Sequence, residues 1–169
     1  MNAAHLHLMF NHLPIVGLGF AILFNLLAIL RKSEELIRLS CWFYILVGLL
    51  SVLAILTGDG AGEIIKTYPG ISNDAIENHE TWGYILFYGL IAVGAGSLAA
   101  LWFSRKDTMH LKKVNLAALI LSVLLLVFAY QAGVSGGKIR HPEIEQGNYS
   151  GKQVVATFAS QALQINTKP

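Results

Sequence analysis

Charged residues are scarce in this sequence. Only 13% of the 169 residues are Asp, Glu, Lys or Arg, whereas 54% are hydrophobic. An average soluble chain carries about a quarter charged residues, so there is too little charge here to cover the surface of a soluble domain. The formal net charge is +2, and the basic residues are not gathered on one face, which excludes nucleic acid as an expected partner. The composition is that of a membrane protein.

Cysteine is almost absent as well. The single residue, Cys41, excludes an internal disulfide, a Cys-x-x-Cys redox pair and a Cys-x-x-Cys-His motif for covalent haem attachment. No period of about 20–50 residues recurs, which argues against a solenoid. The sequence also lacks a Walker-type glycine loop and a serine in a nucleophile elbow, so neither nucleotide nor hydrolase chemistry is indicated.

Four long apolar windows take up most of the chain. Each is close to the ~20 residues that a helix needs to cross ~30 Å of hydrocarbon, and in lipid the backbone groups must bond to one another within helices. The short connections make their flanking helices antiparallel neighbours. The sequence therefore predicts an all-α membrane protein, an antiparallel four-helix transmembrane bundle over residues 1–142, followed by a polar tail at 143–169. The windows cover residues of about 8–30, 39–57, 82–103 and 114–134.

Basic residues beside the span ends predict the orientation. The short loops 31–38 and 104–113 hold seven Lys and Arg residues, whereas the opposite side holds five scattered ones. Loops rich in Lys and Arg stay in the cytoplasm. Both termini, the 58–81 loop and the tail should then face the periplasm, with the chain as a multi-pass protein of a bacterial inner membrane. The first window does not resemble a cleavable signal peptide, because its positive charge follows it.

Histidines gather at the predicted outer end of this bundle. Only His110 of the six lies on the cytoplasmic side, and the outer end of the second window adds Asp59 and Glu63. Every helix thus sends an ionisable group to one end of the bundle, and this is the main functional signal in the sequence. The five outer histidines are His5, His7, His12, His79 and His141.

Two of these histidines share a helix face with a glycine. Gly19 follows His12 by seven residues, and Gly83 follows His79 by four. A planar macrocycle between helices needs an axial nitrogen with open space beneath it, and this spacing supplies both. The alternative is that the glycines let helices pack closely and the histidines serve as interfacial hydrogen-bond residues. The pattern predicts non-covalent haem b ligated by His12 and His79, with His141 in reserve.

The segment after the fourth window adds two cations. Lys138 and Arg140 would pair with haem propionates or with lipid phosphates, although a helix end followed by a basic interface anchor has the same composition. A mononuclear copper, zinc or iron site is a further alternative, with the same three histidines as ligands. Additional ligands or hydrogen-bond partners for either kind of metal site would be His7, Asp59, Glu63 and Glu80.

Three short motifs of the bundle resemble a known family. They are His12-Leu13-Pro14-Ile15, His79-Glu80-Thr81-Trp82-Gly83 and Gly136-Gly137-Lys138-Ile139-Arg140-His141, and the likeness covers residues 5–142. The family comprises bacterial four-helix membrane domains of unknown function that are associated with or fused to c-type cytochromes. The resemblance implies an electron-transfer setting, with His12, His79 and His141 as the matching positions. Any c-type haem would have to come from a partner, because this chain has no covalent haem motif.

The expected function is therefore that of a cytochrome b-like electron-transfer subunit rather than a stand-alone enzyme. Its haem would lie near the periplasmic face, between the quinone pool and a c-type cytochrome or other redox subunit of a respiratory chain. Two alternatives stay open: a cofactor-free accessory or assembly subunit of a membrane redox complex, and the mononuclear metal site. Membrane lipid should surround the helices.

Overall fold

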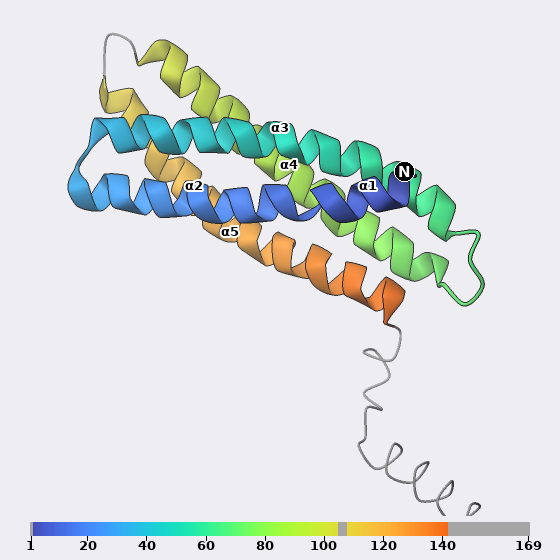
Figure 1. Cartoon of the computed structure of the whole chain (residues 1–169). Coiled ribbons are helices and arrows are strands. Elements are labelled where there is room, and N and C mark those ends of the chain that lie inside the picture. The colour runs from blue at the N-terminus through green and yellow to red at the C-terminus, as the bar shows by residue number, and fades with distance from the viewer. Residues whose placement is uncertain (1, 105–107, 142–169) are drawn as a thin grey trace, which may run out of the picture.

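The computed structural model describes residues 2–104 and 108–141, and every regular element in them is an α-helix (Figure 1). If α1 and α2 are taken as one interrupted helix, four helices are long and apolar enough to cross a membrane. The four predicted apolar helices are confirmed, whereas the predicted tail at 143–169 lies outside the described residues. The elements are α1 (Ala3–Phe10), α2 (His12–Arg31), α3 (Glu34–Ile65), α4 (Asn73–Phe103) and α5 (Thr108–Arg140).

Local sequence explains where the first helices begin and end. Pro14 has no backbone N–H and cannot donate to the carbonyl of Phe10, and the helix is interrupted next to that carbonyl, at Asn11. Ser33 and Ser72 begin α3 and α4, because each side chain accepts a hydrogen bond from the first turn, at 3.3 and 3.4 Å. A serine oxygen there satisfies an N–H group that the helix leaves unpaired.

Two helices run further than their apolar windows. We expected the second window to end at Gly58 and the fourth before Gly136, yet α3 continues to Ile65 and α5 to Arg140. Both glycines lie inside their helices, and each is packed against the histidine ring of another helix. The absent side chain therefore makes room for an imidazole, although the predicted apolar windows 39–57 and 114–134 stop before these glycines.

The helices lie side by side along one long axis (Figure 1) and pack around a core that includes Leu18, Tyr44 and Leu90. Gly48 of α3 and Gly94 of α4 bring two helices especially close, since a Cβ at position 94 would lie 3.1 Å from the carbonyl oxygen of Tyr44. The outer surface is apolar, and Leu30 and Phe103 are each 75% exposed. An apolar surface of this extent is suited to contact with lipid.

Several polar side chains inside the bundle are paired across helices. The amide of Asn25 donates to the Tyr44 hydroxyl (3.2 Å) and to the backbone carbonyl of Asn115 (2.9 Å). The Asn115 amide donates in return to Asn25 Oδ1 at 2.7 Å, and Ser40 donates to Asn115 Oδ1 at 2.8 Å. Burying an amide without partners is costly, so these bonds fix how α2, α3 and α5 meet.

The second half of the bundle repeats the burial pattern of the first. Each buried residue of α2 has a buried counterpart at one constant spacing in α4, as Leu18 has Leu90. Five buried residues of α3 have buried counterparts in α5 at a second constant spacing, as Val47 has Leu125. We call these the α2–α4 spacing and the α3–α5 spacing, and both are longer than the repeats sought in the sequence. The pairs are Pro14 with Leu86, Leu18 with Leu90, Ala21 with Val93, Asn25 with Ser97, Ala28 with Ala100, Ile37 with Asn115, Ser40 with Ala118, Tyr44 with Ser122, Val47 with Leu125, and Ser51 with Ala129.

The close α3–α4 contact predicts different outcomes for two nearby glycines. Gly94→Val should lower the free energy of unfolding of the detergent-solubilised protein by about 1–3 kcal/mol more than Gly96→Val does. The reason is that, of the two positions, only 94 faces a neighbouring backbone. Nothing lies within 4 Å of a Cβ at position 96, and both variants carry the same change in helix propensity. Thermal unfolding followed by circular dichroism measures the difference. Equal melting temperatures would contradict the packing described here.

Candidate functional site

A cavity of about 670 Å³ lies at the end of the bundle where α1 begins and α5 ends. We call it the histidine cavity. All five helices contribute to its lining, and most of the lining side chains are apolar, among them Ile15, Ile55, Leu86 and Phe87. Its volume is within the range of pockets that hold small molecules and cofactors.

His7 of α1 reaches across to α3 and is held there by the backbone. Its Nδ1 lies 3.0 Å from the carbonyl oxygen of Ala54 and 3.4 Å from the hydroxyl of Thr57. The ring covers Gly58, where a Cβ would lie 3.1 Å from Cε1 of the imidazole. A side chain at position 58 would therefore push the ring away from its anchor.

His79 of α4 is held on α5 in the same manner. Its Nδ1 lies 2.9 Å from the carbonyl oxygen of Ala132 and 3.3 Å from the hydroxyl of Ser135. A Cβ on Gly136 would lie 3.0 Å from Cε1 of this ring. The two histidines are separated by the α2–α4 spacing, and their anchors Ala54 and Ala132 by the α3–α5 spacing. The two half-sites thus follow the repeat of the buried residues.

The anchors determine which ring nitrogen carries the proton. A carbonyl oxygen only accepts hydrogen bonds, so Nδ1 of both His7 and His79 must donate. In a neutral imidazole the other nitrogen, Nε2, then keeps its lone pair. Metal-bound histidines are commonly fixed by this bond from the second ring nitrogen to a carbonyl. Each ring is thus oriented with Nε2 available as a ligand.

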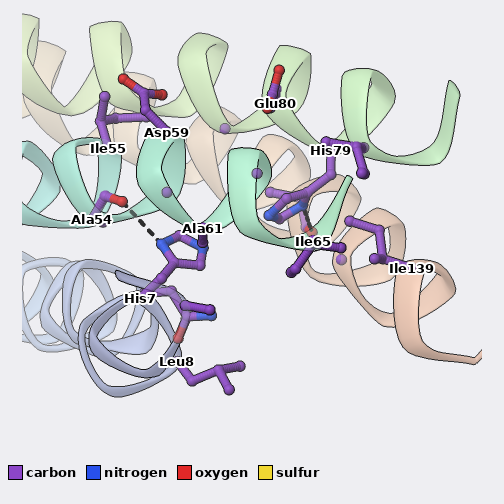
Figure 2. A pocket seen from close by; sticks show the side chains of 18 of the residues that line it. His7, Leu8, Ala54, Ile55, Asp59, Ala61, Ile65, His79, Glu80 and Ile139 are labelled. Atoms are coloured by element: carbon purple, nitrogen blue, oxygen red, sulfur yellow. Dashed lines mark hydrogen bonds between the residues drawn. The ribbon is translucent and has the colours of Figure 1, made fainter. Parts of the chain in front are cut away.

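The two rings face each other inside the cavity. Their centres lie 6.2 Å apart and their planes are inclined by 76°. Figure 2 shows the Nε2 edges of His7 and His79 turned toward one another, whereas the anchored Nδ1 of His7 points to Ala54. Two imidazoles bonded to opposite sides of one metal, at metal–nitrogen distances of about 2.0 Å, have ring centres about 6 Å apart. The spacing suits a single metal centre between them.

The other predicted ligands are not part of this pair. His12 lines the cavity, but its side chain is exposed and its ring is hydrogen-bonded to the adjacent Asn11. His141 is exposed just beyond α5 and does not line the cavity. The predicted partner of His79 is thus replaced in this arrangement by His7, which the sequence had suggested only as an additional ligand.

Of the two predicted glycines and the two predicted cations, one of each lines the histidine cavity. Gly83 lines the cavity with nothing within 4 Å of an added Cβ, as a slot beside His79 requires. Gly19 has equally open surroundings but does not line the cavity. Arg140 lines it at the end of α5, whereas Lys138 lies beside Asp74 and Asn78 in a separate small depression.

Acidic groups lie along the contact between α3 and α4. Asp59 accepts a hydrogen bond from the Tyr84 hydroxyl at 2.8 Å, and its carboxylate points away from the two rings (Figure 2). Glu80 packs on α3, since a Cβ on Gly62 would lie 2.7 Å from its Oε1. Glu63 pairs with Lys66 at 2.9 Å and raises the pKa of that ammonium group. Within residues 2–104 and 108–141, no three His, Cys, Asp or Glu residues form a group suited to a metal ion.

The sequence holds a signal for this pair that its local patterns do not reveal. Residues 54–58 read Ala-Ile-Leu-Thr-Gly and residues 132–136 read Ala-Gly-Val-Ser-Gly, so both outer helix ends carry Ala-x-x-Ser/Thr-Gly. In the structure this segment supplies a carbonyl, a hydroxyl and a gap for one imidazole. A search for repeats at longer spacings would have found it.

Fold and site together define a class: an all-helical membrane protein with four candidate spans and a cavity at one end that contains two carbonyl-anchored histidines. Residues 3–141 match the model of a family described as predicted membrane protein (DUF2231), and the chain belongs to this family. Neither the curated proteins nor the solved structures gave a match.

The anchored geometry predicts an uncommon tautomer for two histidines. In protein labelled with ¹⁵N-histidine, His7 and His79 should each carry their proton on Nδ1, because each donates to a carbonyl. Long-range ¹H–¹⁵N correlation spectra distinguish the two tautomers. His7→Gln and His79→Gln assign the signals, and His5→Gln, which removes an exposed ring, serves as control. Protons on Nε2 of either ring would show that the anchor is not formed.

Proposed function

We propose that this protein is a cytochrome b-like electron-transfer subunit in which His7 and His79 ligate one non-covalent haem in the histidine cavity. The single observation that supports it most is the facing pair of Nε2 edges, with ring centres 6.2 Å apart in a largely apolar cavity. His79 keeps the role that the sequence suggested for it, and His7 takes the place of His12.

The residues present fit a haem in three respects. Each imidazole is oriented by its own carbonyl, so both ligands are in position before the cofactor binds. The Nε2 edges of His7 and His79 face each other across the cavity, so the two imidazoles would hold the haem iron between them. The apolar lining excludes water from the flat faces, and Gly83 leaves the helix face beside His79 open.

Bound haem would supply a reversible one-electron couple, and the chain would tune it. His7 and His79 would hold the haem as two neutral imidazoles, and the bound group would supply electron transfer rather than ligand chemistry. The carbonyl bonds to Nδ1 make both ligands more electron-donating, and this lowers the reduction potential. The hydroxyls of Thr57 and Ser135 keep the two rings from rotating.

The setting of this activity follows from the topology proposed for the chain. An antiparallel bundle with loops 31–38 and 104–113 in the cytoplasm puts the histidine cavity at the periplasmic side of a bacterial inner membrane. Haem there lies within reach of quinol in the membrane and of a c-type cytochrome or another redox subunit outside it. The subunit would carry electrons between them in a respiratory chain.

Variant spectra test the ligand pair. His7→Ala and His79→Ala should each abolish the sharp α band of the dithionite-reduced protein or convert it to a high-spin spectrum, since each removes one axial ligand. His12→Ala should leave the spectrum unchanged, because its ring lies outside the pair. Pyridine extraction should release the haem, as no thioether holds it.

Three other results would contradict part or all of the proposal, and each points to a different alternative. Loss of the low-spin spectrum in His12→Ala or His141→Ala, but not in His7→Ala, would contradict the ligand pair. Wild-type protein from haem-replete cells without a Soret band would contradict haem binding. Metal analysis of that protein then separates a mononuclear copper, zinc or iron site from an accessory subunit without a cofactor.

A further inference from the structure

The two halves of the bundle meet along two seams, which the internal repeat makes comparable. One seam joins α3 of the first half to α4 of the second. The other lies between α5 and the helices α1 and α2, of which α2 packs against α5. Each position on one seam has a counterpart on the other. Residues of α1 and α2 correspond to residues of α4 at the α2–α4 spacing, and residues of α3 correspond to residues of α5 at the α3–α5 spacing. Where the residues at corresponding positions differ, the internal repeat does not explain the difference.

The α3–α4 seam is closed at the level of the histidine cavity. Gly48 and Gly94 bring the helices into backbone contact further down, and the Tyr84 hydroxyl donates to Asp59 across the seam at 2.8 Å. Glu80 covers Gly62 near the end of the same seam. Asp59, Tyr84 and Glu80 thus connect the two helices by side-chain contacts beside the cavity.

The opposite seam is open. The counterpart of Asp59 is Gly137 on α5, and the counterpart of Tyr84 is His12 on α2. Because glycine has no side chain, Gly137 cannot form the bridge that Asp59 forms on the closed seam. In the described part of the chain no Cα atom of α1 lies within 8 Å of one in α5, and Figure 1 shows the two helices apart. Gly133, one turn before Gly137, is exposed and also lines the cavity. Neither glycine has an atom within 4 Å of an added Cβ.

Charge differs between the two seams as well. The closed seam carries the carboxylates of Asp59 and Glu80, whose counterparts on the open seam are Gly137 and Leu8. The open seam carries Arg140 at the end of α5, and its counterpart on the closed seam is Gly62. Arg140 and Gly62 both line the cavity. A flat ligand with an anionic edge would be repelled by the first seam and attracted by the guanidinium of the second.

We infer that the gap between α1 and α5 is a lateral portal through which haem enters the cavity from the membrane, with its propionate edge beside Arg140. This inference rests on the proposed function and adds the route and the orientation of the cofactor. Leu8, which is 64% exposed, and the glycines Gly133 and Gly137 form the two walls of the portal. Haem is an apolar plate with two carboxylates, so an apolar entrance that ends at a cation suits it.

Uptake kinetics test the portal. Full-length protein produced without haem is mixed with haem-loaded phosphatidylcholine vesicles, and the low-spin Soret band is followed with time. Gly133→Leu and Gly137→Leu should slow uptake at least about tenfold, because each fills the portal with a side chain. Gly96→Leu is the matched control, since its surroundings are equally open but it does not line the cavity. Circular dichroism verifies that all three variants are folded.

A second arm tests the orientation. Arg140→Gln should weaken binding of haem at least about tenfold, as loss of a charge-assisted hydrogen bond does, and leave binding of haem dimethyl ester unchanged. Equal losses for haem and ester would overturn the placement of the propionates. Equal uptake rates in all three glycine variants would overturn the portal while leaving haem binding intact. Failure of the wild-type protein to take up haem would overturn the proposed function and the portal together.

Discussion

The hydrogen bond from an imidazole Nδ1 to a helix carbonyl is the interaction on which the site depends. His7 and His79 each make it, at 3.0 and 2.9 Å, with a carbonyl four residues before a glycine. The glycine leaves room for the ring, the carbonyl fixes the tautomer, and the hydroxyl of Thr57 or Ser135 lies within 3.4 Å of the same Nδ1. Nε2 of each ring is then directed toward the other ring in a largely apolar cavity, as the haem proposed between them requires.

The internal repeat explains why two such half-sites meet. Buried positions recur with one spacing in α2 and α4 and with another in α3 and α5, so each half presents its anchored ring to the same cavity. The halves differ at the two seams between them. Asp59 and Tyr84 close one seam, whereas Gly137 and His12 leave the other open. Pro14 also separates α1 from α2, while its counterpart Leu86 lies in an uninterrupted helix.

Much of the fold follows from composition and pattern alone. Apolar windows of about twenty residues predict the four long helices, and Ser72 is recognisable as a helix start because it is followed by acidic residues. Gly83 and His79 both line the cavity, and their four-residue spacing puts them on one helix face. These features can be predicted because each depends only on residues within one helix and on whether water or lipid surrounds that helix.

The pairing of the histidines required the third dimension. His12 was expected as a ligand because Gly19 follows it on the same helix face, but spacing along one helix does not reveal which way a ring points. The interruption at Asn11 separates the helices of His7 and His12, and only His7 reaches the carbonyl of Ala54. The predicted windows stop before Gly58 and Gly136, since helix propensity cannot show that an imidazole from another helix covers these glycines.

Electron paramagnetic resonance of the oxidised protein tests the central claim most directly. In low-spin ferric haem, parallel imidazole planes split the two iron orbitals of π symmetry, whereas perpendicular planes leave them nearly equal in energy and spread the g values widely. His7 and His79 are inclined by 76°, so the account predicts a strongly anisotropic low-spin signal that disappears in His79→Ala. A signal typical of parallel ligand planes, a high-spin signal, or no ferric haem signal at all would contradict it.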